Sequence, residues 1–228
     1  LDMFARVPIV TSSKVELKDV EQSERSAVFN FVKKELEETV EQLSDAHSNL
    51  SGEYYGRMTK PVAYLLLAKI ALNSEIYADD NWTDGTKIDG KTIKFTVDGE
   101  EKNAWEATIA YCDKITALGY KLEPKFAANF STTNENSVEN IFTIPMDRNL
   151  YKNEFYYLIR SRHYSHAKAY GQGGWNGASA TKEAIDAFGY NTAAQDPRFD
   201  LTYYAGKIEG PAGIIKLDDG TELEYLPS

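Results

Sequence analysis

The chain has 228 residues, of which 35 are acidic and 25 are Lys or Arg, and its formal net charge is −10. This length lets one large or two small domains bury roughly 70% of the unfolded surface, and the acidic balance argues against nucleic acid as a ligand because phosphate binding needs a basic surface. No apolar run approaches the ~20 residues of a membrane-spanning helix, so membrane attachment would have to come from outside this chain.

Two amphipathic helices are predicted in the first third of the chain. Residues 26–43 place apolar side chains at helical spacing, with Glu and Lys opposite them. A second helix, running towards Tyr77, is predicted to begin at Thr59, whose side chain can accept a hydrogen bond from a free backbone N–H, with Pro61 in its first turn. The two starts are separated by nearly the ~34-residue period of a tetratricopeptide repeat, in which paired helices stack.

Residues 79–102 interrupt the helices with a loop that contains Trp82 and a predicted β-hairpin that turns at Asp98-Gly99. A third helix is then predicted over 104–118, with Gly119 as its C-terminal cap. Cys112 lies on this helix and is the chain's one cysteine. We expect it to be a buried thiol and not a nucleophile or a metal ligand.

The character of the chain changes after 141–144, where a short buried strand or extended segment is predicted. The region that follows is rich in aromatic residues, Gly and Asn and has no clear periodicity. The predicted fold is therefore mainly α: residues 1–145 form a scaffold of tetratricopeptide-like helix pairs with a hairpin insertion near 79–102, and residues 146–228 form an irregular, loop-rich ligand face with short β-hairpins. Loops of this kind often carry function.

Exposed aromatic rings with neighbouring polar groups are typical of glycan-binding surfaces, because sugars offer apolar C–H faces and hydroxyl edges. Residues 148–177 contain both kinds of side chain. Trp175 is flanked by glycines that let a ligand approach the backbone, so it is the first candidate platform. Trp82 is a second candidate. For each of them the alternative is an indole packed into the core.

Metal binding and catalysis receive little support from the sequence. The loop 79–85 partly fits a calcium-binding pattern through Asp80, Asp84 and Gly85, but Trp82 stands where an oxygen ligand is expected and no Glu follows at the proper distance. The spacing of His163 and His166 could suit a metal on a helix, although a solvated or hydrogen-bonded pair is the simpler interpretation. No catalytic motif or recognisable carboxylate pair is present, so we expect no enzyme and no cofactor.

The segment 55–77 resembles a signature of the SusD/RagB family of outer-membrane glycan-binding lipoproteins of Bacteroidetes, G-R-x-T-K-x-x-A-x-x-L-L-A-K-x-x-L-N-x-x-x-Y. The matching residues are Gly56, Arg57, Thr59, Lys60, Ala63, Leu66, Leu67, Ala68, Lys69, Leu72, Asn73 and Tyr77. The opening 1–10 is similar to a family segment that ends in G-x-V-P-L-V, although Ala5 replaces the usual Gly. Further similarities lie at 120–122, Phe130 and 139–142, and the resemblance extends to about residue 200.

The resemblance implies tetratricopeptide-like helix pairs and a surface-exposed outer-membrane lipoprotein. Such a protein captures glycans without cleaving them and delivers them to a SusC-like TonB-dependent transporter. Family members are considerably longer, so we expect this chain to be a central fragment whose export signal and lipid anchor lie outside it. In the starch-binding member, a Tyr and a downstream Trp form part of an aromatic arc. Tyr151 and Trp175 resemble this pair, although Leu150 is an extra residue after Asn149.

Two alternatives remain open at this stage. The chain could belong to a peptide-capturing SusD/RagB-like protein, because an open aromatic face also accepts extended peptides. It could instead be a helical-repeat scaffold for protein interaction, whose aromatic residues are structural. The scaffold interpretation predicts that Tyr151 and Trp175 are buried and that no small ligand binds.

Overall fold

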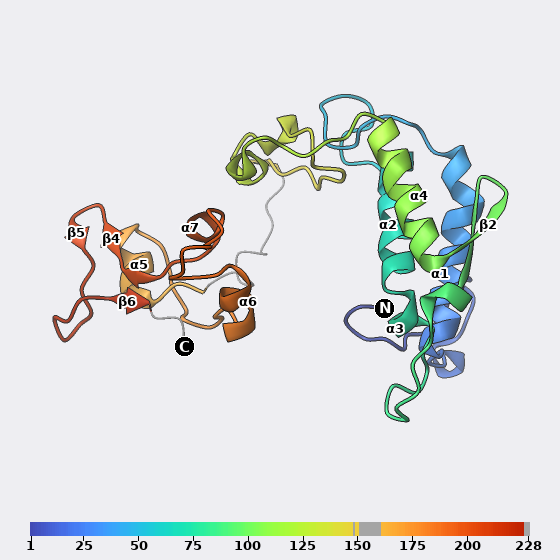
Figure 1. Ribbon diagram of the computed structural model, residues 1–228, viewed down its shortest axis with the longest axis horizontal. Coiled ribbons are helices and arrows are strands. Elements are labelled where there is room, and N and C mark those ends of the chain that lie inside the picture. Colours follow the sequence, from blue (N-terminus) through green and yellow to red (C-terminus); the bar gives the residue numbers. More distant parts are fainter. Residues whose placement is uncertain (148, 151–160, 226–228) are drawn as a thin grey trace. The chain divides into compact units, whose positions relative to one another are not determined.

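The computed structural model describes residues 1–147, 149–150 and 161–225. These residues belong to two compact units, Leu1–Pro145 and Met146–Ser228 (Figure 1). The prediction of a mainly helical fold with short antiparallel strand pairs is confirmed. Within the described ranges, no helix has both the length and the apolar character needed to cross a membrane.

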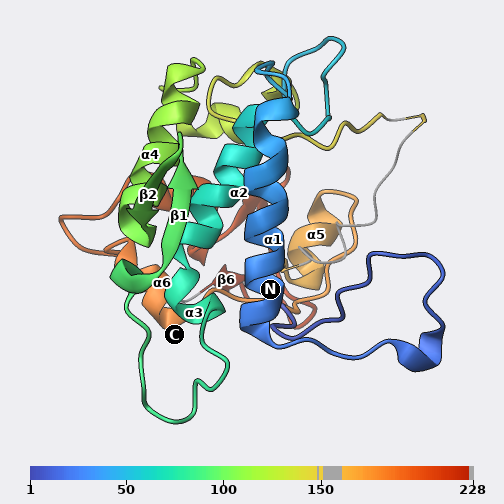
Figure 2. The ribbon, with the colours of Figure 1, turned by 90° about the vertical axis from the view of Figure 1, so that its right-hand side faces the viewer.

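The first unit is built around helix α2, Lys60–Leu72, which packs against α1, Arg25–Thr39, and against α4, Ala104–Ala117. Figure 2 shows the three helices side by side, with α2 between α4 and α1. The α2 face is buried through Ala63, Leu67 and Ala71. The two alanines at this face allow a neighbouring helix to approach closely.

The start and the end of α2 differ from the sequence prediction in two details. Thr59 occupies the N-cap position, but its buried hydroxyl makes no hydrogen bond to the described residues. The first N–H of the helix, that of Lys60, donates instead to the carbonyl of Ser44 at 2.8 Å, and Pro61 has no N–H to satisfy. The helix also ends early at Asn73, after which a separate short helix α3 covers Ser74–Tyr77.

The predicted hairpin is present as strands β1, Lys94–Val97, and β2, Glu100–Asn103. Asp98 and Gly99 both have positive φ, as a tight two-residue turn of this kind requires. The pairing begins at 94 and not at 91 because Gly90–Thr92 forms a 3-10 turn capped by the Asp89 side chain.

Helix α4 begins with a capping box in which the Asn103 side chain accepts from the backbone N–H of Glu106, and the Glu106 carboxylate accepts from the N–H of Asn103. The helix buries Tyr111 and Ile115. Cys112 is exposed, so the prediction of a buried thiol is wrong. Its position directly after Tyr111 turns it about 100° away from the buried face.

The second unit contains short elements. Its helices are α5, Tyr164–Ala169; α6, Lys182–Ala187; and α7, Phe199–Thr202. Strand β3, Gly206–Lys207, pairs with β6, Glu224–Tyr225, and β4, Glu209–Gly210, pairs with β5, Gly213–Ile214. Ile208, Ile215 and Leu223 form a small apolar cluster among these strands. In the first unit, segment 141–144 is not a strand, and none of its four residues is buried, so the expected burial is wrong. The 3-10 helices among the described residues are Leu17–Asp19, Val40–Gln42, Gly90–Thr92, Phe126–Phe130 and Asn134–Asn136.

Asp80 caps the N-terminus of α1 from a distant loop. Its carboxylate accepts from the backbone N–H of Ser26 at 2.8 Å and from the Ser26 hydroxyl at 2.6 Å. Burial alone would raise the pKa of Asp80, but these hydrogen bonds and the charges of Arg6 and Arg25 outweigh burial and hold the pKa below its ordinary value of 3.8.

We therefore expect Asp80→Ala to lower the free energy of unfolding by about 1–2 kcal/mol at pH 7, measured by urea denaturation, because it removes the cap. Asp113→Ala, an exposed substitution on α4, serves as the control, with a change within about 0.5 kcal/mol. The folded state favours the ionised Asp80, so its contribution is complete above about pH 5 and declines as the pH falls through and below 3.8. An Asp80→Ala effect that stays constant down to pH 3 would contradict this role.

Candidate functional site

A cavity of about 370 Å³ opens within the second unit. This volume is in the range of small-ligand sites, which combine apolar walls with a few placed polar groups. Its aromatic and polar lining residues are Phe199, Tyr203, Tyr204, Tyr225, Ser161, Arg162, Asn176, Ser179, Lys182 and Thr202. The cavity therefore offers ring surfaces and hydrogen-bonding groups to one ligand.

The aromatic wall forms where the end of α7 meets strand β6. Tyr203 ends α7, and its N–H donates to the carbonyl of Phe199 at 2.9 Å. The pairing of Gly206 with Tyr225 then brings the C-terminal strand next to this turn. As a result the rings of Tyr204 and Tyr225 stack with centroids 6.3 Å apart and planes inclined by 30°.

Arg162 supplies the half-buried guanidinium group of the cavity. Its Nη1 donates to Oε1 of Gln172 at 3.0 Å. The guanidinium carbon also lies 5.7 Å from the ring centroid of Tyr204 and 6.0 Å from that of Tyr170. These contacts hold the charged group beside the aromatic wall.

His166 supports the wall from behind and is only 1% exposed. Its Nδ1 lies 3.1 Å from the hydroxyl of Tyr225, and its ring meets that of Tyr204 edge-on at 4.6 Å. Burial, helped by the charge of Arg162, lowers the pKa of His166, so the ring is neutral at pH 7. The neighbouring His163 donates its backbone N–H to the same tyrosine hydroxyl at 2.8 Å. The two histidines are thus part of one hydrogen-bonded support for Tyr225.

The glycine-rich loop 171–177 packs against the segment that carries Arg162. A Cβ at Gly174 would lie 2.7 Å from the carbonyl oxygen of His163 and 2.8 Å from that of Arg162, so only glycine fits there. The N–H of Asn176 donates to the carbonyl of Arg162 at 3.0 Å, and the Asn176 residue itself lines the cavity. The loop therefore positions one polar group of the site.

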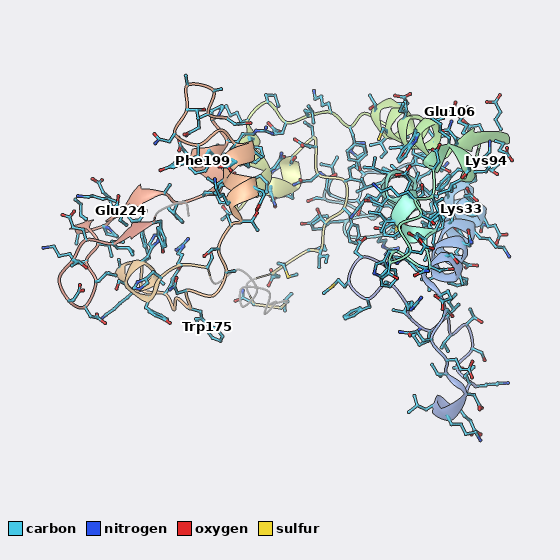
Figure 3. All side chains as sticks on the ribbon, turned by 60° about the horizontal axis from the view of Figure 1, so that its bottom comes forward. Lys33, Lys94, Glu106, Trp175, Phe199 and Glu224 are labelled. Atoms are coloured by element: carbon cyan, nitrogen blue, oxygen red, sulfur yellow. The ribbon has the colours of Figure 1, made fainter. Side chains whose placement is uncertain are left out.

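Trp175, the first predicted platform, stands in this loop between Gly174 and Asn176. It is 54% exposed, and Figure 3 shows its side chain projecting from the ribbon. Among the described lining residues, its neighbour Asn176 is included but Trp175 is not. The exposed indole does not fit the alternative of a core tryptophan.

The other two predicted platforms are Tyr151 and Trp82. Tyr151 falls outside the described residues. Trp82 belongs to the first unit and is 53% exposed, with the guanidinium carbon of Arg25 4.4 Å from its ring centroid and that of Arg6 at 5.4 Å. Two cation–π contacts thus already engage the indole of Trp82.

The acidic loop around Trp82 uses its carboxylates in local turns. Asp84 accepts from the N–H of Thr86 at 2.7 Å and from the Asn81 amide at 3.2 Å, and Asp79 accepts from the N–H of Asn81. In the parts of the chain that the structure describes, no group of three or more His, Cys, Asp or Glu residues has an arrangement suited to a metal ion. Two carboxylates of this loop therefore stabilise its local turns through hydrogen bonds.

The sequence prediction missed Arg162, Tyr203, Tyr204 and Tyr225 as members of one site. The available signal was the adjacent pair of tyrosines, Tyr203 and Tyr204, two residues before Gly206 in the aromatic part of the chain that follows Trp175. Strands β3 and β6 are each two residues long, which is too short for a periodic pattern to predict their pairing.

Comparison with solved structures finds similarity to the crystal structure of a SusD-like protein from Bacteroides fragilis NCTC 9343. The TM-score is 0.56 and the sequence identity 20%, over 87% of this chain and 34% of that one, so the chain spans about a third of the length of that structure. A scan against protein-family models and a search of curated proteins found no match. The chain has the fold of a SusD-like protein.

Proposed function

We propose that this chain is part of a SusD-like surface protein that captures glycans without cleaving them. The observation that carries the proposal is the cavity of the second unit, in which tyrosine rings lie beside Arg162, Asn176 and Lys182. The fold similarity supports the same conclusion. Tyrosine rings accept the apolar face of a sugar, and the polar groups accept or donate hydrogen bonds at its hydroxyl edge.

The hydrogen bonds and ring contacts behind the tyrosine rings favour ligand binding because they already fix the conformations of these side chains. The hydroxyl of Tyr225 is held by His163 and His166, and the ring of Tyr204 rests on the edge of His166. Side chains that are already ordered lose less conformational entropy when a ligand binds. A binding role is further supported because none of the described lining residues is acidic, whereas glycoside hydrolysis ordinarily uses two carboxylates.

The partner and the location form the second part of the proposal. The intact protein would be anchored by a lipid to the outer face of the outer membrane and deliver captured glycan to a SusC-like TonB-dependent transporter. This part rests on the fold similarity to a SusD-like protein. Co-purification of the intact protein with a TonB-dependent transporter from outer membranes would test it.

Tyr204→Ala should weaken glycan binding at least tenfold, a loss of about 1.4 kcal/mol, because it removes an aromatic wall of the cavity. The measurement is calorimetric titration with those glycans that a glycan array identifies. Trp175→Ala, followed in the same titrations, tests whether the loop platform takes part. Tyr164→Ala is the matched control, since Tyr164 is exposed in the same unit but does not line the cavity.

The outcomes separate the candidate functions. Glycan binding that is lost in Tyr204→Ala and kept in Tyr164→Ala supports the proposal, provided that both variants melt near the parent temperature. Binding of extended peptides in place of glycans would support the peptide-capturing alternative. Equal glycan affinity of Tyr204→Ala and the parent would show that the cavity is not the binding site.

A further inference from the structure

We infer that the ligand of the cavity is an acidic glycan, one that carries carboxylate or sulfate groups; this inference rests on the proposed function. The chain as a whole is acidic, with a net charge of −10. The charge of the cavity lining has the opposite sign. Among its described lining residues, Arg162 and Lys182 are basic and none is acidic.

Arg162 is the stronger of the two anion-binding groups. Its guanidinium bonds the neutral amide oxygen of Gln172 and lies over tyrosine rings. No carboxylate within the described ranges forms an ion pair with it, in contrast to Arg6 and its partner Glu24. A guanidinium has five N–H donors in a planar fork that matches the geometry of a carboxylate or another oxyanion. Donors thus remain for an anionic ligand.

The guanidinium of Arg162 lies close enough to two groups of the aromatic wall to change their pKa values. Together with burial, Arg162 lowers the pKa of His166. It also opposes the rise that burial imposes on the pKa of Tyr225. Tyr225 lines the cavity and His166 lies directly behind it, so the positive charge acts on this side of the cavity, where it favours a negatively charged ligand.

Lys182 adds a second, weaker cation. Its Nζ lies 2.8 Å from Oδ2 of Asp186 one helical turn away, and both side chains are largely exposed. Exposed ion pairs of this kind contribute little, so the ammonium group can exchange Asp186 for a ligand anion at small cost. The lining thus offers two cations to a ligand that carries more than one negative charge.

Long-range repulsion by the acidic surface does not prevent such binding. At physiological ionic strength, exposed charges are screened beyond about 8 Å, whereas a half-buried guanidinium next to the ligand is screened much less. Contacts inside the cavity therefore dominate the affinity. A tenfold preference corresponds to about 1.4 kcal/mol, the order of one hydrogen bond to a charged group.

The test compares pairs of ligands that differ in one anionic group. The full chain is titrated at pH 7.5 with oligogalacturonides, with the same oligomers after carboxyl reduction, and with κ-carrageenan oligomers before and after desulfation. We expect at least tenfold tighter binding of an acidic oligomer than of its uncharged counterpart. The carrageenan pair carries sulfate and no carboxylate, so it distinguishes recognition of sulfate from recognition of carboxylate.

Variants then assign the preference to Arg162. Arg162→Gln should weaken binding of the acidic oligomer about tenfold more than it weakens binding of the reduced oligomer, because a neutral amide can still bond sugar hydroxyls but carries no charge. Arg162→Lys keeps the charge without the fork and should retain part of the preference. Lys216→Gln, an exposed change outside the cavity lining, removes the same charge from the same unit and should have no effect. Thermal unfolding of each variant identifies any loss of folding.

The results distinguish failure of this inference from failure of the proposed function. If acidic and reduced oligomers bind equally, and Tyr204→Ala weakens both, the acidic preference is wrong while glycan capture stands. If the acidic preference persists in Arg162→Gln and disappears in Lys216→Gln, the charge acts elsewhere and the inference is wrong. If neither these oligomers nor any glycan on the array binds, both are wrong.

Discussion

Leu67→Ala is expected to lower the free energy of unfolding of the first unit by about 3 kcal/mol, because it opens a cavity at the centre of the core. Leu67 is 0% exposed on α2, the helix that packs against both α1 and α4. The measurement is urea denaturation followed by circular dichroism at 222 nm. Loss of a buried side chain of this kind costs about 2–5 kcal/mol in other proteins.

Leu72→Ala provides the matched control for this prediction. It makes the same chemical change at the end of the same helix, but Leu72 is 56% exposed, so the expected effect is within about 0.5 kcal/mol. The difference between their free energies of unfolding thus measures the contribution of burial, because the change in helix propensity is nearly the same in both variants. Equal effects would mean that α2 does not present Leu67 to the core.

The first unit was largely predictable because its elements follow from local rules. Helical spacing of apolar residues predicted α2 and its buried face at Ala63 and Leu67. The Asp98-Gly99 pair predicted the hairpin, since both residues adopt the positive φ that a tight turn needs. The expectation for Cys112 was wrong because the residue directly after the buried Tyr111 does not lie on the same face of the helix.

The cap of α1 could not be predicted in this way. The helix begins where expected, yet its cap comes from Asp80, which lies in a loop far away in the sequence. The hydroxyl of Thr59 was expected to cap α2, but the carbonyl of Ser44 serves the first N–H of that helix. Local patterns predict that a helix starts, whereas the group that satisfies its free N–H groups depends on the tertiary fold.

The sequence predicted a ligand face in residues 148–177, which remains a prediction, but it did not predict the geometry of the cavity. The aromatic and Gly-rich composition of residues 148–177 indicated a ligand face, and Trp175 is exposed there. The cavity itself depends on a strand pair that joins Gly206 to Tyr225 across a long loop. Contacts of this kind leave no periodic trace in a single sequence, so the role of Arg162 beside Tyr204 became evident only in three dimensions.

Gly174→Ala should destabilise the cavity wall more than other single changes in the loop 171–177. The added methyl group would lie 2.7 Å from the carbonyl oxygen of His163 and 2.8 Å from that of Arg162, and backbone atoms cannot move aside as a flexible side chain can. Overpacking of this kind costs about 1–3 kcal/mol. The loop must shift outward, which breaks the 3.0 Å hydrogen bond from Asn176 to Arg162.

Hydrogen exchange of residues 161–177 and glycan affinity together measure this effect. Gly173→Ala is the matched control, because a Cβ at Gly173 meets no atom within 4 Å, and we expect exchange and affinity to remain those of the parent. In Gly174→Ala, faster exchange at Asn176 with affinity reduced at least tenfold would show that the loop positions the binding groups. Faster exchange with unchanged affinity would instead show that the loop does not contribute to binding and that the tyrosine wall binds the ligand without it.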